Sequence, residues 1–194
     1  MEISEKIYLV NREQWRDWLK ENHAKVKDIW LIYYKKNSGK PRIPYNDAVE
    51  EALCFGWIDS IVKSVDEDCY VQRFSPRRKN SQLSEANKER IRQLIKSGQM
   101  TSAGLESIKH HINESADLTD HNAIFDKFQI PKDILEALKK DDDVWKNFNH
   151  FPEHYKRVRI GWIDSARIRP DEFNKRLNYF LKRTKENKIF GMIK

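Results

Sequence analysis

Apolar residues in the first part of the chain recur with two different periods, and these periods predict both helices and strands. Trp15, Trp18 and Leu19 follow the i, i+3, i+4 spacing of one helix face, so residues 14–21 are predicted to form a helix. The run at 29–34, Ile-Trp-Leu-Ile-Tyr-Tyr, is apolar at every position. A short β-prone run of this kind is typical of a central strand that is buried on both faces.

The next segment predicts a helix followed by a β-hairpin. Apolar residues between 48 and 55 are spaced for a helix face, and Gly56 is placed to end that helix. Residues 61–65 and 69–74 alternate moderately around an acidic turn, which predicts two paired strands. Pro76 then ends the second strand, because proline cannot donate to a strand ladder.

From residue 84 onwards the pattern is helical. Ser84 is suited to cap the start of a helix and Gly98 to follow its end. Pro131, Pro152 and Pro170 each stand where a first helical turn begins, which predicts three C-terminal helices.

These elements together predict an α+β fold: a small sheet with a β-hairpin and helices at the N-terminal side, followed by a C-terminal helical region. We expect an α+β domain over residues 1–111 and a helical region over residues 131–194. Residues 112–130 are mostly polar, acidic and weakly periodic, so we interpret them as a linker.

The pentapeptide Gly-Trp-Ile-Asp-Ser occurs twice, at residues 56–60 and 161–165. The flanking residues do not match, whereas true repeats are similar across a whole structural unit. We therefore interpret the two copies as a coincidence rather than as a duplication.

Charge is distributed unevenly along the 194 residues, whose formal net charge is +7. Residues 71–109 carry a net charge of +6 and residues 156–194 one of +8, and they flank an acidic middle, residues 110–155, of −5. A positive face attracts nucleic acid, anionic metabolites or acidic protein surfaces. The same pattern also fits a solvated, lysine-rich surface, or basic and acidic segments that pack together.

Targeting signals are missing from the sequence. No apolar run approaches the length of about 20 residues that a membrane-spanning helix needs, and the first residues lack the pattern of a secretory signal. We therefore expect a cytoplasmic protein without a membrane span, in which Cys54 and Cys69 stay free thiols. The sequence leaves the oligomeric state open.

The strongest candidate for a ligand site is an arginine cluster around the end of the predicted hairpin. Arg73, Arg77 and Arg78 could grip an anion, because a guanidinium donates two parallel hydrogen bonds to a carboxylate or a phosphate. Trp57 could add a stacking face, and Asp59 could shape the pocket. The alternative is an exposed hairpin exit whose arginines pair with nearby carboxylates, Asp59 among them.

Signatures of catalysis and of metal binding are weak. The phosphate-loop, dinucleotide-binding, nucleophile-elbow and zinc-protease motifs do not occur. Asp59 as a general base and Cys54 as a nucleophile remain open, since each needs a partner that the sequence does not show. His150 and His154 are four residues apart, but Pro152 separates them. We therefore predict no metal site and no cofactor.

A set of motifs is spread over roughly residues 14–108. The motifs are Ile29-Trp30-Leu31, Tyr34-Lys35-Lys36, Ser38-Gly39-Lys40-Pro41, Glu50-Glu51-Ala52-Leu53, Phe55-Gly56-Trp57-Ile58-Asp59, Gln72-Arg73-Phe74-Ser75-Pro76-Arg77-Arg78 and Gly98-Gln99-Met100-Thr101. Together they resemble the YdeI/OmpD-associated family, whose members are described as bacteriocin-protection proteins. A looser resemblance extends into the tail.

The resemblance implies a role in stress or bacteriocin protection, and the residues suggest how it is carried out. Our leading hypothesis is a non-catalytic protein that recognises an anionic small molecule or an acidic protein through the arginine cluster. One alternative is a nucleic-acid-binding protein that uses the two basic segments. The other is an enzyme that acts on a small phosphorylated or carboxylated substrate.

Overall fold

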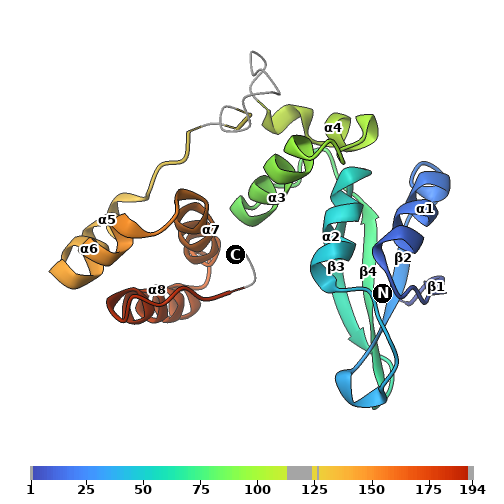
Figure 1. The fold of residues 1–194 in the computed structure, drawn as a ribbon, viewed down its shortest axis with the longest axis horizontal. Coiled ribbons are helices and arrows are strands. Elements are labelled where there is room, and N and C mark those ends of the chain that lie inside the picture. The colour runs from blue at the N-terminus through green and yellow to red at the C-terminus, as the bar shows by residue number, and fades with distance from the viewer. Residues whose placement is uncertain (1, 113–123, 126, 192–194) are drawn as a thin grey trace. The chain divides into compact units, whose positions relative to one another are not determined.

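The computed structural model describes residues 2–112, 124–125 and 127–191 of the chain. It confirms the α+β class: a four-stranded sheet and its helices form the N-terminal part, and the C-terminal part is helical (Figure 1). The predicted linker at 112–130 lies largely outside the described residues and stays a prediction.

Two compact units make up the chain. The first contains residues 1–81 and 91–124, and the second contains residues 82–90 and 125–194. The short stretch 82–90 therefore belongs to the same unit as the C-terminal helices, although residues 91–124 separate them in the sequence.

The sheet belongs to the first unit, and its strands follow the order β1-β2-β4-β3. Strand β1 runs parallel to β2, while β2 and β3 each pair antiparallel with β4. The predicted central strand and the predicted hairpin are both confirmed. Strand β1 was not predicted, since two residues are too short for a periodic pattern. The strands are β1 (Lys6–Ile7), β2 (Ile29–Tyr34), β3 (Trp57–Ser64) and β4 (Cys69–Pro76).

Helices α1 and α4 of the first unit begin at capping side chains. Asn11 accepts a hydrogen bond from the N–H of Gln14, and Thr101 accepts one from the N–H of Gly104, each satisfying a donor of the first helical turn. The helices are α1 (Arg12–Asn22), α2 (Tyr45–Cys54), α3 (Glu85–Lys96) and α4 (Ser102–Ile108), with short 3₁₀ segments at Lys36–Ser38 and Lys109–His111.

Helices α1 and α2 cover one face of the sheet. The ring of Trp15 in α1 packs edge-on against Phe74 in β4, with 5.5 Å between the ring centroids. The hydroxyl of Tyr45 in α2 donates to Asp59 Oδ2 in β3, at 2.9 Å. Phe74 and Asp59 are register partners, so their side chains leave the same face of the sheet. Both helices therefore pack on that face.

Four helices form the C-terminal part of the second unit, although the sequence predicted three. Helix α5 ends at Lys139, and Asp141 accepts hydrogen bonds from the N–H groups of Asp143 and Val144, so it caps a separate helix, α6. Aromatic and branched residues from all four helices form the core. The helices are α5 (Lys132–Lys139), α6 (Asp142–His150), α7 (Glu153–Asp164) and α8 (Pro170–Lys185).

Candidate functional site

Trp57, the first residue of β3, is a core side chain of the first unit. It is 1% exposed, and its indole Nε1 donates to the carbonyl oxygen of His23, at 3.1 Å. Its ring also contacts Trp18 edge-on, at 5.8 Å between centroids. Because both its apolar surface and its polar atom are engaged, Trp57 presents no stacking face to a ligand.

Asp59 and Arg73 lie on opposite faces of the sheet. Asp59 accepts a hydrogen bond from Gln72 Nε2, at 2.7 Å. Arg73 follows Gln72 in β4, and successive side chains of a strand point to opposite faces. Arg73 Nη2 instead forms an ion pair with Asp28 Oδ2, at 3.0 Å. The pair Asp59–Arg73, one of the arrangements expected from the sequence, is therefore not formed.

Arg77 and Arg78 follow the end of β4 and differ in their surroundings. Arg77 is 9% exposed, and its Nη2 donates to the carbonyl oxygen of Ser81, at 2.8 Å. Burial lowers the pKa of the Arg77 guanidinium. Arg78 is exposed, and its carbonyl oxygen accepts from Ser81 Oγ. The five residues predicted as a ligand site thus serve separate local interactions, and anion binding by them stays a prediction.

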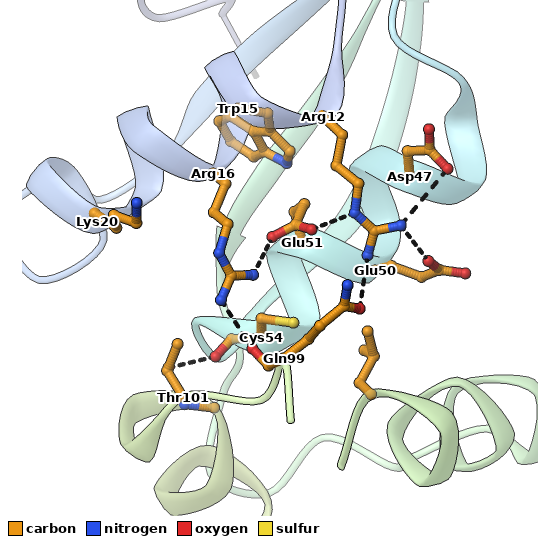
Figure 2. Close-up of polar contacts among 12 residues, drawn as sticks. Arg12, Trp15, Arg16, Lys20, Asp47, Glu50, Glu51, Cys54, Gln99 and Thr101 are labelled. Atoms are coloured by element: carbon orange, nitrogen blue, oxygen red, sulfur yellow. Dashed lines mark hydrogen bonds and ion pairs between the residues drawn. The ribbon is translucent and has the colours of Figure 1, made fainter. Parts of the chain in front are cut away.

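A buried ion network, which the sequence analysis missed, ties α1 to α2 (Figure 2). Glu51 is 1% exposed and accepts hydrogen bonds from Arg12 Nε and from Arg16 Nη1, the latter at 2.6 Å. Arg12 also pairs with Glu50, at 2.9 Å, and donates to Gln99 Oε1, at 3.2 Å. The signal was present in two arginines four residues apart on one helix face. Because the Glu51 carboxylate receives two guanidinium groups, we interpret this network as a structural clamp.

Cys54, at the end of α2, is the candidate nucleophile from the sequence. It is fully buried, and burial raises the pKa of its thiol to about 11. A thiol with so high a pKa is neutral at pH 8, whereas the thiolate is the reactive form.

We expect neither cysteine to react with iodoacetamide in the folded protein at pH 8. Cys54 and Cys69 are both buried free thiols, and both have a raised pKa. Intact-mass spectrometry should show no adduct before denaturation and two adducts in urea. Rapid labelling of Cys54 in the folded protein would show that its thiol is accessible and reactive, and Cys54 would then remain a candidate nucleophile.

A cavity of about 670 Å³ lies within the second unit. Its walls come from α7, from the segment around the start of α3, and from the chain that leads into α5. The volume falls in the range of small-molecule sites, and most such sites are lined by apolar side chains with few polar groups. The residues that line it include Leu83, Phe128, Val158, Arg159 and Trp162.

Arg159 is the unusual residue of this cavity. It is 8% exposed, and none of the described residues accepts a hydrogen bond from its guanidinium or forms an ion pair with it. Three aromatic rings surround the guanidinium carbon instead: Phe190 at 5.0 Å, Tyr155 at 5.6 Å and Trp162 at 6.0 Å. Burial lowers the pKa of Arg159. The rings stabilise the cation but leave its donors unused.

The basic neighbours of Arg159 in α7 are paired, which sets Arg159 apart. Lys156 forms an ion pair with Glu153, at 2.8 Å, and Arg157 forms one with Glu89, at 2.9 Å. Arg159 belongs to the same charged run. Its position in the cavity, rather than its place in the sequence, therefore leaves it without a carboxylate partner among the described residues.

Sequence reasoning missed Arg159 because it stands in a run, Lys-Arg-Val-Arg at 156–159, that resembles a solvated helix face. Helical spacing did contain a signal. Arg159 lies four residues after Tyr155 and three before Trp162, and both of those aromatic residues belong to the buried side of α7. Nothing in the sequence shows that no acidic residue meets it.

The described residues contain neither a metal-ligand cluster nor a membrane-spanning helix. Within residues 2–112, 124–125 and 127–191, no group of three or more His, Cys, Asp or Glu side chains could hold a metal ion. In the same part of the chain, no helix is both long enough and apolar enough to cross a bilayer.

Comparison with known proteins assigns families to both parts of the chain. Residues 7–107 match a family model described as a domain of unknown function, DUF8412. Residues 127–187 match the model of the bacteriocin-protection, YdeI or OmpD-associated family. The resemblance identified from the sequence is thus confirmed, but the match falls on the C-terminal helices rather than on residues 14–108. No curated protein and no solved structure matches the chain.

Proposed function

The chain belongs to the DUF8412 family, and it carries a bacteriocin-protection, YdeI or OmpD-associated region at residues 127–187; from these premises we propose that it is a non-catalytic binding protein whose anionic ligand lies beside Arg159. The helices α5 to α8 fall within the second match, and α7 supplies Arg159. The proposed ligand site therefore lies largely in the region that gives the chain its link to bacteriocin protection.

One observation carries the proposal: a buried guanidinium that finds no hydrogen-bond acceptor among the described residues lines a cavity that is large enough for a small molecule. Burying a charge without a partner costs several kcal/mol. An unpaired buried charge that is kept despite this loss of stability commonly serves a function, since ionisable groups with strongly perturbed pKa values are concentrated at functional sites. An anion in the cavity would supply the missing acceptor through charge-assisted hydrogen bonds.

Binding without covalent chemistry fits this cavity better than catalysis does. A catalytic site needs a general base or a nucleophile within hydrogen-bond reach of the bound molecule. The carboxylates that line the cavity are Glu85 and Asp164, and each already pairs with a neighbour, Lys88 and Arg167 respectively. Their negative charges are therefore engaged in ion pairs on their own helices or just beyond them.

Replacing Arg159 by methionine tests the proposal. Titration with sodium benzoate and with inorganic phosphate, followed by calorimetry, is expected to show binding to the parent protein. Affinity should fall at least about tenfold in Arg159→Met, because a hydrogen bond to a charged group contributes about 1.5–3 kcal/mol. The variant should stay folded, with a melting temperature no lower than that of the parent, because methionine fills similar space without an unpaired charge.

The matched control is the pair of variants Arg77→Ala and Arg78→Ala, which probe the cluster predicted from the sequence. These variants are expected to bind both anions as the parent does. If they lost binding while Arg159→Met retained it, the ligand site would belong to the hairpin exit, and the proposal for the second unit would be wrong.

A further inference from the structure

We infer that the ligand beside Arg159 is a small apolar monocarboxylate, whose carboxylate lies on the guanidinium and whose hydrocarbon or aromatic part lies against Trp162. This inference rests on the proposed function of the cavity and narrows it to one chemical class. Three properties of the cavity support it: its charge, the space around the guanidinium, and the nature of its walls.

The charge of the lining favours a ligand with a single negative charge. Arg159 is the lining cation that lacks a partner, whereas Arg90, the other arginine of the lining, donates to Asn87 Oδ1, at 3.1 Å. Glu85 and Asp164 add two carboxylates to the same lining, and each is already paired, with Lys88 and Arg167 respectively. A second negative charge on the ligand would meet only Arg90 as a further cation of the described lining, and Arg90 is already engaged in hydrogen bonding.

The space around the guanidinium favours a flat anionic group. The rings of Phe190 and Tyr155 lie within 5.6 Å of the guanidinium carbon. The backbone of Gly191 is also close, since a side-chain carbon built there would lie 2.6 Å from Arg159 Nη2. A guanidinium fork can donate two parallel hydrogen bonds to a carboxylate or to a phosphate, so shape decides between them. A carboxylate is planar, whereas a tetrahedral phosphate carries oxygens out of that plane and needs more room beside the rings.

The walls favour an apolar body on the ligand. Leu83 and Val158 are 7% and 3% exposed and line the cavity together with Phe128 and Trp162. A carboxylate alone would leave most of a cavity of about 670 Å³ unfilled. An aromatic or branched hydrocarbon part would remove these walls from water and could stack on the indole of Trp162.

Calorimetry on the full chain with four compounds distinguishes the possible classes of ligand. The compounds are 2-naphthoate (an apolar carboxylate), acetate (a carboxylate without a large apolar part), inorganic phosphate, and the uncharged 2-naphthalenemethanol. The expected result is that 2-naphthoate binds at least tenfold more tightly than each of the other three. This comparison uses the parent protein alone, so it does not depend on whether any variant folds.

Two variants then assign the two parts of the ligand. Arg159→Met should remove the advantage of 2-naphthoate over 2-naphthalenemethanol, whereas Trp162→Leu should weaken both of these ligands by a similar factor. Far-UV circular dichroism checks that each variant is folded.

The outcomes separate the inference from the proposed function. Tighter binding of phosphate than of 2-naphthoate, lost in Arg159→Met, would overturn the monocarboxylate and leave anion binding at Arg159 intact. Equal binding of acetate and 2-naphthoate would overturn the apolar body of the ligand. If neither phosphate nor 2-naphthoate bound to the parent protein, both proposals would be overturned. The same would follow if these two anions bound to Arg159→Met as tightly as to the parent.

Discussion

Replacing Glu51 by alanine is expected to lower the free energy of unfolding by about 3 kcal/mol. The Glu51 carboxylate is almost fully buried and receives both Arg12 and Arg16, so its removal leaves two guanidinium groups that have lost their common acceptor. The side chains of these arginines are 27% and 28% exposed, which places the loss at the lower end of the range for broken buried pairs. Urea unfolding followed by circular dichroism measures it.

An exposed ion pair on α1, the helix that carries Arg12 and Arg16, serves as the control. Lys20 and Asp17 pair at 2.8 Å, but their side chains are 57% and 68% exposed. Asp17→Ala should therefore change stability by less than about 1 kcal/mol. Glu51→Gln should fall between the two variants, because it keeps hydrogen-bonding atoms and loses the charge. A stability of Glu51→Ala equal to that of Asp17→Ala would show that the clamp contributes nothing beyond a surface pair.

Replacing Gly104 by alanine is expected to destabilise the protein by about 3 kcal/mol, because overpacking costs commonly reach that size. Gly104 lies in α4, where helix propensity alone would favour alanine by about 1 kcal/mol. A side-chain carbon at this position would lie 2.3 Å from the carbonyl oxygen of Cys54 and 2.8 Å from its carbonyl carbon. These are backbone atoms at the end of α2, and they cannot turn away. Thermal and urea unfolding both report the change.

Gly161 provides a matched test in another helix. A side-chain carbon there would lie 2.6 Å from Glu85 Cγ and 2.7 Å from Glu85 Cβ, and a Cβ atom moves only with its backbone. Gly161→Ala should therefore also destabilise the protein, but by less than Gly104→Ala, because the carbon at 104 meets main-chain atoms directly. If Gly104→Ala proved as stable as the parent, the close approach of α4 to α2 would be contradicted.

Local patterns in the sequence predicted those elements whose stability depends on near neighbours. The run 29–34 forms β2 with the predicted bounds, and Ser84, the predicted cap, accepts a hydrogen bond from the N–H of Asn87 at the start of α3. The capping role of Asp141 was missed, because apolar residues continue at helical spacing on either side of it. The repeated pentapeptide shows the limit of local reasoning. The copy at 56–60 begins in the turn before β3, whereas the copy at 161–165 lies mostly inside α7.

The candidate site depended on tertiary contacts that no local pattern contains. Asp59 and Arg73 stand near each other in the predicted hairpin, but the register, with its irregularity between Asp59 and Val62, decides which face each side chain takes. Arg159 is buried in part because Phe190, thirty-one residues later in the chain, returns to its guanidinium. Helical spacing predicts the nearby rings of α7, and only the fold shows that no carboxylate from the described part of the chain joins them.

The division of α3 between the two units bears on how the two families can be combined. A boundary drawn between the matches, after residue 107 and before residue 127, would separate residues 82–90 from the unit to which they belong. Arg157 would lose Glu89, and the cavity would lose the wall that Leu83 provides. The C-terminal region is therefore not an interchangeable module in this chain: a gene rearrangement that transplanted it alone would deliver its helices without one wall of the cavity.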